Sequence, residues 1–321
     1  MLSRLRRNAG AVVVDSFFRG ISAAGRLHPN ARPERHRVEV VRDVRYRDSD
    51  SPDHLLDVYR PTRGSAPFRV VLYVHGGGFR ILSKDTHWVM GLAFARRGFL
   101  VLNASYRLAP KHPFPAAIED VCAAYAWAVE NAARFGGDPS RIVLAGESAG
   151  ANLVTALSIA TCWPRSEPWA RTVWDTGVVP RAVVPACGLL QVSDVERFRR
   201  RKQSLPIFLL DRMAEVESAY LRNRHRVAPE SLDFADPLVF LERAERPERP
   251  IPPFFIPVGT KDPILDDTRR LHAALGSLGA TSEARYYEGE VHAFHALVFR
   301  PNARRCWGDT YAFLDRHVPH A

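Results

Sequence analysis

The segment at residues 141–155, RIVLAGESAGANLVT, constrains the fold of this chain more than any other stretch. A short apolar run ends at Gly146, and from Ala149 onward apolar residues recur at helical spacing, so the pattern predicts a strand, a tight turn and a helix. Ser148 lies in the turn. Strand and helix approach so closely in such a turn that Cβ atoms at Gly146 and Gly150 would collide with the backbone, and glycine removes that collision.

The hydroxyl of this serine is therefore expected at the N-terminus of a helix. Free N–H groups and the helix dipole favour a developing negative charge at that place. An ordinary glycine-rich turn with a solvent-facing serine is the alternative interpretation of a lone G-x-S-x-G string. The surrounding sequence decides between the two.

The elements around the turn alternate in a way that predicts an α/β fold. Residues 70–74 form a continuous apolar run, which is typical of a strand buried on both faces of a parallel sheet. Alternating strands and helices imply right-handed crossovers and a mainly parallel sheet flanked by helices. Residues 38–46 and 54–59 predict an antiparallel hairpin before it. Further strands are predicted at 99–104, 182–186, 254–258 and 283–287, with helices at 116–135 and 267–278.

Three adjacent glycines follow the buried strand directly, in the sequence His75-Gly76-Gly77-Gly78-Phe79. Glycines are entropically costly to order, so a flexible surface loop is one interpretation. Their position at the carboxyl end of a strand, however, is where open α/β sheets bind ligands. A backbone without side chains can turn its N–H groups toward an oxyanion, which agrees with a nucleophilic serine nearby.

An aspartate and a histidine complete the pattern at the ends of two later strands. Asp262 follows one predicted strand, and His292 follows the last one. The chain order Ser, Asp, His, with each residue just beyond a strand, is the order found in α/β-hydrolases. Asp266 and Asp267 stand close by, but only Asp262 directly follows the strand, where a rigid turn can direct a carboxylate toward the histidine.

Together these motifs resemble the hormone-sensitive-lipase-like family of α/β-hydrolases, bacterial carboxylesterases related to arylacetamide deacetylase. The resemblance extends from about residue 54 to the C-terminus. It rests on HGGGF at 75–79, YRLAP at 106–110, GESAGANL at 146–153, the Asp262-Pro263 turn and His292.

The resemblance implies a role for each residue of these motifs. Ser148 would be the nucleophile, His292 the general base and Asp262 the acid that orients the histidine. Three backbone N–H groups would form the oxyanion hole, those of Gly77, Gly78 and Ala149. Supporting positions in the glycine-containing motifs would belong to His75, Gly76, Gly146 and Gly150.

The sequence departs from the family pattern at three places. Glu147 stands where an aspartate is usual, and Ala151 stands where a glycine is usual, without loss of a catalytic group. The loop at 80–83 lacks a glycine that the family often carries there. The shape of the nearby acyl pocket therefore does not follow from the resemblance.

The resemblance implies a serine carboxylesterase that hydrolyses short- to medium-chain esters through an acyl-enzyme, with no metal or organic cofactor. An amidase, a formamidase or a deacetylase would use the same triad. A non-catalytic ligand-binding protein on this fold would be expected to have lost a triad member. A basic protein that acts at a membrane surface or on a partner would leave the ordered triad unexplained.

Length and composition predict one domain with a cap. The chain has 321 residues, of which 46% are hydrophobic, and this is enough for one large core. We expect a single α/β-hydrolase domain over 1–321, with a helical cap from 1–37 and 193–237, because these segments are left over once the sheet and its helices are assigned. Candidate apolar residues of the cap are Phe17, Phe18, Phe208, Leu209 and Leu210.

The formal net charge of +10 is compatible with weak attraction to anionic groups, but no nucleic-acid-binding motif accompanies it. The densest basic run, residues 197–202, is therefore expected to form a solvated face. The four cysteines are predicted to be buried free thiols of a cytoplasmic protein. The N-terminal apolar stretch is interrupted by Asp15 and does not fit a secretory signal, and no stable membrane insertion is expected. The expected partner is a small ester molecule, and a homodimer is left open.

Overall fold

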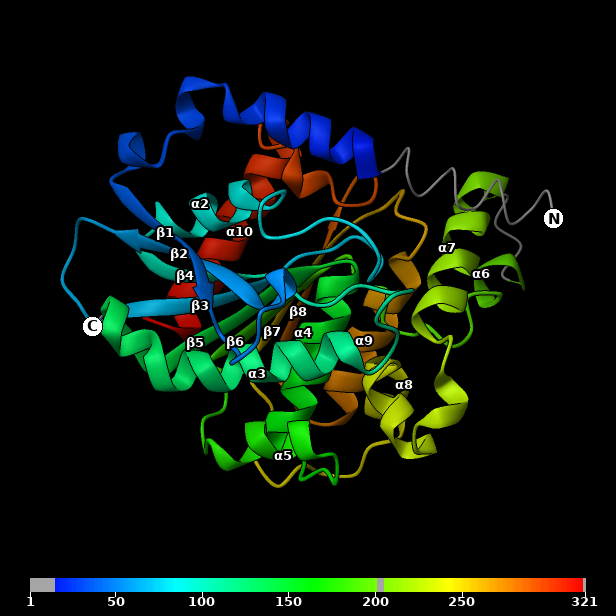
Figure 1. Cartoon of the computed structure of the whole chain (residues 1–321). Coiled ribbons are helices and arrows are strands. Elements are labelled where there is room, and N and C mark those ends of the chain that lie inside the picture. The colour runs from blue at the N-terminus through cyan, green and yellow to red at the C-terminus, as the bar shows by residue number, and fades with distance from the viewer. Residues whose placement is uncertain (1–14, 201–204, 320–321) are drawn as a thin grey trace.

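The computed structural model describes residues 15–200 and 205–319, and a twisted sheet lies at its centre (Figure 1). The sheet order is β1-β2-β4-β3-β5-β6-β7-β8. β1 with β2 and β2 with β4 are antiparallel, and all other neighbours are parallel. The predicted α/β-hydrolase fold with a mainly parallel sheet is confirmed. The strands are β1 (Val38–Arg45), β2 (Leu55–Pro61), β3 (Phe68–Val74), β4 (Phe99–Ala104), β5 (Gly137–Glu147), β6 (Ala182–Ala186), β7 (Phe254–Gly259) and β8 (Ser282–Tyr287).

Helices cover both faces of the sheet, and a further helix at 15–26 lies at one end of it (Figure 1). The α-helices are α2 (Trp88–Ala95), α3 (Ala116–Asn131), α4 (Ala149–Cys162), α5 (Pro168–Asp175), α6 (Arg197–Arg200), α7 (Ile207–Tyr220), α8 (Pro237–Arg243), α9 (Leu265–Ser277) and α10 (Pro301–His317). Short 3-10 helices are η1 (Pro29–Ala31), η2 (Pro33–His36), η3 (Pro52–His54), η4 (Ala132–Phe135), η5 (Arg224–Arg226), η6 (Pro229–Phe234) and η7 (Phe294–Ala296).

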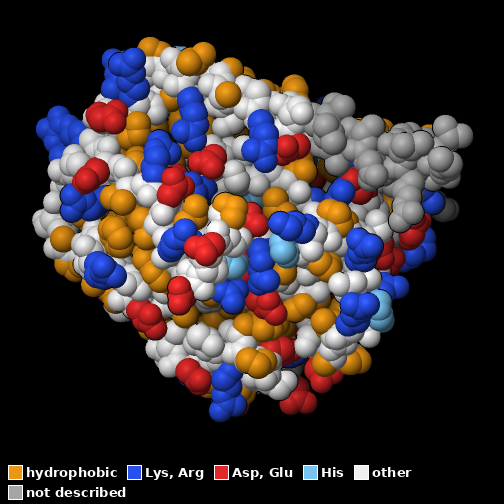
Figure 2. Space-filling model, in the orientation of Figure 1, with side chains coloured by type: hydrophobic (Ala, Val, Ile, Leu, Met, Phe, Trp, Pro, Cys, Tyr) orange, Lys and Arg blue, Asp and Glu red, His pale blue; other side chains and the backbone are white. Residues whose placement is uncertain are grey.

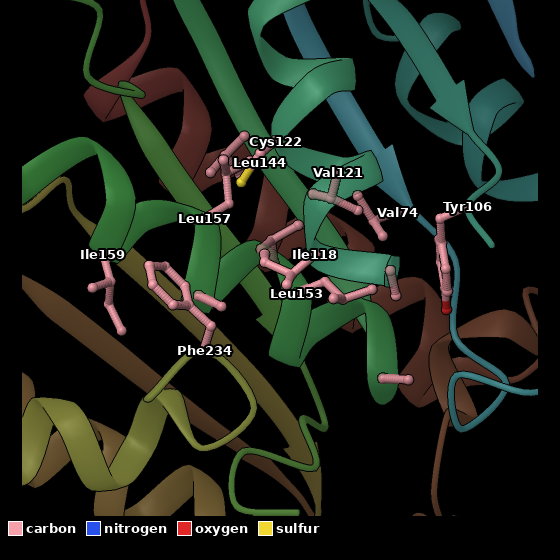
Figure 3. Close-up of a cluster of buried hydrophobic side chains, with 14 of the residues drawn as sticks. Val74, Tyr106, Ile118, Val121, Cys122, Leu144, Leu153, Leu157, Ile159 and Phe234 are labelled. Atoms are coloured by element: carbon pink, nitrogen blue, oxygen red, sulfur yellow. The ribbon is translucent and has the colours of Figure 1, made fainter. Parts of the chain in front are cut away.

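Alternate side chains of the strands divide the core into two layers, because successive side chains of a strand point to opposite faces. Leu72 and Val74 of β3 pack in the layer that contains α3 and α4. Val71 and Tyr73 pack in the layer that contains α2 and α10. Figure 3 shows part of the first layer, with side chains from α3, α4 and the strands in one cluster. Burial of each large apolar side chain contributes about 1.5–3 kcal/mol to folding.

The helix that follows the turn at Ser148 is buried along its whole length. Every residue of α4 is buried, and the helix carries small and apolar side chains on all sides, as expected for a helix surrounded by protein. It contacts β5 and β6 of the sheet and the helices α3, α5 and α8. The turn is therefore supported from the interior of the molecule.

One helix, α2, lacks an amphipathic signal in the sequence. α2 has the nearly uniform apolar sequence WVMGLAFA, and its residues from Met90 to Ala95 are all buried, so it shows no helical period. α5 is a short helix of eight residues outside α3 and α4.

The expectation of a solvated basic face at 197–202 is wrong for its first residue. Arg197 is 5% exposed, and its Nη2 lies 2.6 Å from Asp267 Oδ2. Its Nη1 donates to the carbonyl of Gln191 at 2.6 Å. This arginine is a structural residue because a buried guanidinium requires a charged partner and carbonyl acceptors. Arg199 and Arg200 do lie at the surface, whereas 201 and 202 lie outside the described residues.

Charged side chains of both signs are interspersed over the face shown in Figure 2. Surface arginines pair repeatedly with acids on this chain, for example Arg60 with Glu39 and Arg270 with Glu242. The net charge of +10 is therefore not gathered into one basic surface on this face. Within the described residues, no helix is both long enough and apolar enough to cross a membrane.

Candidate active site

Ser148 lies between β5 and α4 with a backbone conformation that side chains rarely adopt, φ 53° and ψ −114°. The two flanking glycines allow it. A Cβ at Gly150 would lie 2.1 Å from the carbonyl oxygen of Val74, and a Cβ at Gly146 would lie 2.7 Å from the backbone of Gly150. The Ser148 N–H donates to the carbonyl of Ala186 at 3.0 Å, which ties the turn to β6.

His292 and Asp262 form a hydrogen-bonded pair, with His292 Nδ1 at 2.9 Å from Asp262 Oδ2. The Asp262 side chain is fully buried, and its Oδ1 accepts from the N–H of Ile264 at 3.0 Å. Burial lowers the pKa of His292, but the charge of Asp262, together with the neighbouring Cys187 and the hydrogen bond to Asp262, prevails and holds that pKa well above 6.5. The pair can therefore stabilise an imidazolium at this position.

The two neighbouring aspartates have other contacts. Asp266 pairs with Arg269 at 3.1 Å, one turn along α9. Asp267 is buried, and besides its ion pair with Arg197 it accepts from the N–H of Leu190 at 2.9 Å. Asp262 is thus the aspartate of the three that the structure brings to the histidine.

The glycine loop after β3 has the conformation that its sequence requires. Gly77 has φ +104° and Gly78 has φ +59°, both in the region that favours glycine. A Cβ at Gly77 would lie 2.1 Å from the carbonyl oxygen of Ile81. Within the described chain, the N–H groups of Gly77, Gly78 and Ala149 donate no hydrogen bond to another residue. Three donors are therefore left for a ligand.

His75 is held inside the protein beneath this loop. Its ring stacks on Tyr106 with centroids 4.2 Å apart, and its Nδ1 lies 2.7 Å from the carbonyl oxygen of Gly76. Tyr106 donates its hydroxyl to the carbonyl of His75 at 2.9 Å. Burial, together with the nearby His87, lowers the pKa of His75 to about 3, so the ring is neutral. These contacts shape the loop and present no catalytic group to a substrate.

Ser148 and His292 are not directly hydrogen-bonded to each other in the described structure. Hydrogen bonds between catalytic groups are often long in proteins without substrate and shorten when the substrate is bound. The arrangement offers a serine hydroxyl, an oriented imidazole and unpaired N–H donors at one edge of the sheet. These are the groups that acyl transfer through a serine requires.

Sequence reasoning missed that Cys187 lies beside the histidine. One ligand atom from each of Cys187, Asp262 and His292 lies within 4.8 Å of the other two. Among the described residues, these three form the group whose spacing could hold a metal ion. Cys187 is buried, which raises the pKa of its thiol. The signal was available, because Cys187 directly follows β6 and so reaches the same carboxyl edge of the sheet.

The sequence shows Glu147, the residue before Ser148, only as a departure from the family pattern. In the structure its carboxylate is buried. Glu147 contacts Tyr73, His87 and His295, all of them buried. Neither His87 nor His295 belonged to the predicted site. His295 could have been suspected because it stands three residues after His292.

Parts of the two predicted cap segments contact the glycine loop. The ring of Tyr220, at the end of α7, stacks on Phe79 with centroids 3.8 Å apart. A Cβ at Gly78 would lie 2.7 Å from Cγ2 of Val216, also on α7. From the helix at 15–26, Asp15 accepts from the N–H of Leu82 at 3.3 Å.

The fold and the site together define an α/β-hydrolase. Residues 71–296 match the family described as alpha/beta hydrolase fold. The chain therefore belongs to this family, of the hormone-sensitive-lipase-like type, and the resemblance noted in the sequence is confirmed.

Curated relatives and a solved structure agree with this assignment. Carboxylesterase NlhH of Mycobacterium tuberculosis is 33% identical over 272 residues, which cover 81% of this chain and 77% of the relative. The acetyl esterase of Salmonella schwarzengrund is 30% identical over 227 residues, which cover 70% of this chain and 65% of the relative. An esterase from Pyrobaculum calidifontis superposes with a TM-score of 0.72 at 25% identity, covering 94% of this chain and 91% of that one.

Proposed function

We propose that this protein is a serine carboxylesterase that hydrolyses short- to medium-chain carboxylic esters. One observation carries the proposal. Ser148 occupies a sharp turn with unpaired N–H groups around it, at the same edge of the sheet as the hydrogen-bonded pair of His292 and Asp262. Relatives named carboxylesterase and acetyl esterase support the substrate class.

In the first half of the reaction, the hydroxyl oxygen of Ser148 attacks the ester carbonyl carbon, and His292 takes the hydroxyl proton. Asp262 holds the imidazole in the tautomer that can accept this proton and stabilises the imidazolium that forms. His292 then donates the proton to the departing alcohol, which leaves an acyl-enzyme. Water, deprotonated by the same histidine, attacks the acyl carbon. The bond from that carbon to the Ser148 oxygen then breaks, His292 returns the proton to this oxygen, and the acid is released.

The tetrahedral intermediates carry negative charge on the former carbonyl oxygen. The N–H groups of Gly77, Gly78 and Ala149 are assigned to this oxyanion because they have no partner in the described chain. Loss of one such donor typically lowers the rate about 100- to 1000-fold. Both positions have positive φ, which favours glycine, and a Cβ would lie 2.1 Å from the carbonyl oxygen of Ile81 at Gly77 and 2.7 Å from Cγ2 of Val216 at Gly78.

We assign the cap to residues 1–37 and 193–237, within the single domain 1–321; residues 1–14 and 201–204 of these segments lie outside the described part of the chain. The contacts of Tyr220 and Val216 with the glycine loop, and of Asp15 with Leu82, support this assignment. A cap at this place would enclose a bounded pocket, which favours acyl chains of limited length.

Covalent labelling tests the proposed nucleophile. Treatment with a small organophosphate is expected to add one group at Ser148 and to abolish hydrolysis of p-nitrophenyl butyrate, while Ser148→Ala neither hydrolyses the ester nor accepts the label. Intact-mass and peptide mass spectrometry locate the group. Labelling of another serine, with Ser148 unmodified, would refute the assignment. A parallel series of anilides separates an esterase from an amidase.

A further inference from the structure

One buried carboxylate joins the segments that carry the proposed catalytic groups. Glu147 directly precedes Ser148 at the end of β5. Its Oε1 lies 2.6 Å from His87 Nε2. Its Oε2 accepts the hydroxyl of Tyr73 at 2.9 Å and lies 3.0 Å from His295 Nε2. Glu147 and its three partners are between 3% and 6% exposed, so the cluster is shielded from solvent.

Each contact of the carboxylate reaches a different part of the site. Tyr73 belongs to β3, the strand that continues into the glycine loop. His295 belongs to η7, in the loop that also carries His292. His87 lies just before α2, and its Nδ1 is within 3.1 Å of the carbonyl oxygen of Ser83. A single side chain thus connects the nucleophile turn to the oxyanion strand and to the histidine loop.

The Glu147 side chain also packs against the glycine loop itself. A Cβ at Gly76 would lie 3.0 Å from Cγ of Glu147, so the backbone of the loop passes directly beside this side chain. Burial raises the pKa of Glu147, but the attraction of His87 and the hydrogen bonds from His295 and His87 bring it well below 4.5. The carboxylate is therefore ionised, and hydrogen bonds to an ionised group are roughly twice as strong as neutral ones.

Ser148 and His292 lack a direct hydrogen bond in the described structure, so other contacts determine their relative position. The loop of His292 is held at Asp262, at the Trp307 side chain, which donates to the carbonyl of His295 at 3.0 Å, and at Glu147. Of these contacts, the one with Glu147 joins the loop to the residue that directly precedes the nucleophile Ser148.

We propose that Glu147 is a positioning residue for catalysis, which sets the distance between the nucleophile turn and the histidine loop by holding His295 and His87 on one carboxylate. The inference rests on the proposed esterase function. It goes beyond the triad because Glu147 touches neither the substrate nor a reacting atom and acts only through the geometry of Ser148 and His292.

Glu147→Gln tests the proposal with little change of shape. The amide presents a donor where two histidine N–H groups need acceptors, so one contact is lost. We expect kcat on p-nitrophenyl butyrate, and the rate at which a small organophosphate modifies Ser148, to fall about 10- to 100-fold, because a displacement of about 1 Å costs that much. KM should change by less than about threefold. Glu147→Asp keeps the charge and should retain more activity than the glutamine variant.

Asp120→Asn is the matched control, since Asp120 is also a fully buried carboxylate bound to a histidine. It lies 3.1 Å from His54 Nε2 and pairs with Arg107 at 2.8 Å, on α3 and outside the proposed machinery. This variant should unfold at a lower temperature than the wild type but, while folded, should be modified by the organophosphate at the wild-type rate. Equal slowing of both variants would mean that Glu147 is only structural, and the proposal would fall.

His295→Phe provides the second arm where Glu147→Gln does not fold, because it keeps a ring at this position, removes the donor to Glu147 and leaves the pair of Glu147 and His87 in place. The same loss of kcat and of modification rate is expected, and a wild-type rate in this variant would overturn the proposal. A wild-type protein that neither hydrolyses esters nor reacts with the organophosphate would instead contradict the proposed function. If the wild type is active and Glu147→Gln keeps the wild-type kcat and modification rate, the positioning role is contradicted while the proposed function stands.

Discussion

Asp262 differs from its acidic neighbours Asp266 and Asp267 in what its carboxylate contacts. Its Oδ2 faces the imidazole of His292, whereas Asp266 pairs along α9 and Asp267 holds the buried Arg197. These three aspartates lie within five positions of one another, yet their carboxylates have different partners. Substitutions can distinguish the orienting acid from its neighbours.

Asp262→Asn is expected to lower kcat by orders of magnitude, by analogy with about 10⁴-fold in the Ser-His-Asp template, because the amide favours the wrong tautomer of His292. Asp266→Asn should cost far less, since its carboxylate is engaged with Arg269. Steady-state kinetics on p-nitrophenyl butyrate compare the two variants. The opposite ranking would assign the acid to Asp266.

The pKa of His292 predicts the pH dependence of the reaction. Only the neutral imidazole accepts the serine proton, and Asp262 holds the pKa well above 6.5, so kcat/KM should rise with pH along a limb that lies above that value. Asp262→Asn should shift the limb toward lower pH. Profiles of kcat/KM between about pH 5 and pH 10 locate this limb in the wild type and in the variant. An unchanged limb in the variant would contradict the assigned pair.

The same shift affects stability in a defined direction. A group whose pKa is raised by folding contributes stability that is complete below its unfolded pKa, about 6.5 for histidine. This contribution is lost as the pH rises through the higher folded pKa. The protonated pair is thus favourable for folding at the pH values where the enzyme is expected to be least active.

At the scale of elements, contacts between α7 and the glycine loop join the segment 193–237 to the proposed oxyanion hole. Tyr220 stacks on Phe79, and its carbonyl accepts from the N–H of Phe114 at 2.8 Å. The helix at 15–26 packs nearby, where Ser22 accepts from the indole of Trp88 at 3.1 Å. Parts of both proposed cap segments therefore contact the scaffold next to the site.

Removal of residues 1–30 tests the first of these segments. The truncated protein should have a higher KM for its preferred ester because part of the enclosing surface is lost, while Ser148 should still react with a small organophosphate. KM values and labelling stoichiometry are measured on the same preparation. Full affinity in the truncated protein would show that the N-terminal segment is not part of the cap.

The ion pair between Arg197 and Asp267 makes a prediction about stability. Both side chains are buried, so Arg197→Ala leaves an uncompensated carboxylate and should reduce the free energy of unfolding by about 3–5 kcal/mol. Arg199→Ala is the matched control, because Arg199 is exposed and its ion pair within the described residues is with the exposed Glu196; its effect should lie within about 0.5 kcal/mol. Urea unfolding curves compare the two. Equal effects would contradict the structural role of Arg197.

At the scale of the whole molecule, the sheet brings the residues of the proposed site to one edge, and the described parts of the proposed cap segments border that edge. The strand order places β3, β5, β6, β7 and β8 side by side, and each of them is followed by a residue of the proposed site or by Cys187. A bounded pocket over this edge would limit the size of the acyl group.

The rate on p-nitrophenyl esters is therefore expected to peak at short or medium chain length. Each added methylene contributes about 0.8 kcal/mol of binding only while there is room to bury it, so kcat/KM should fall for long chains. Acetate, butyrate and decanoate esters, assayed with the same enzyme preparation, define the optimum. Emulsified long-chain triglycerides as the best substrates would show that the pocket is not bounded in this way.

The sequence by itself determined the fold class and the positions of the nucleophile turn and the glycine loop. Both are marked by glycines: Gly146 and Gly150 stand where strand and helix nearly touch, and Gly77 and Gly78 stand where φ is positive and a Cβ would meet a neighbouring residue. Strands buried on both faces also leave a clear local signal in their apolar runs. The motifs can be recognised because they occupy adjacent residues, although the atoms that a Cβ at Gly150 or Gly78 would meet belong to the distant Val74 and Val216.

Only the tertiary structure decided which side chains far apart in the sequence meet. Glu147 and His295 are separated by 148 positions yet share a hydrogen bond, and nothing in either local sequence indicates the other. Cys187 reaches His292 in the same way, and Arg197 is buried inside a run that looked solvated. The physical reason is that burial and pairing depend on how the helices and loops pack over the sheet, which short-range patterns do not encode.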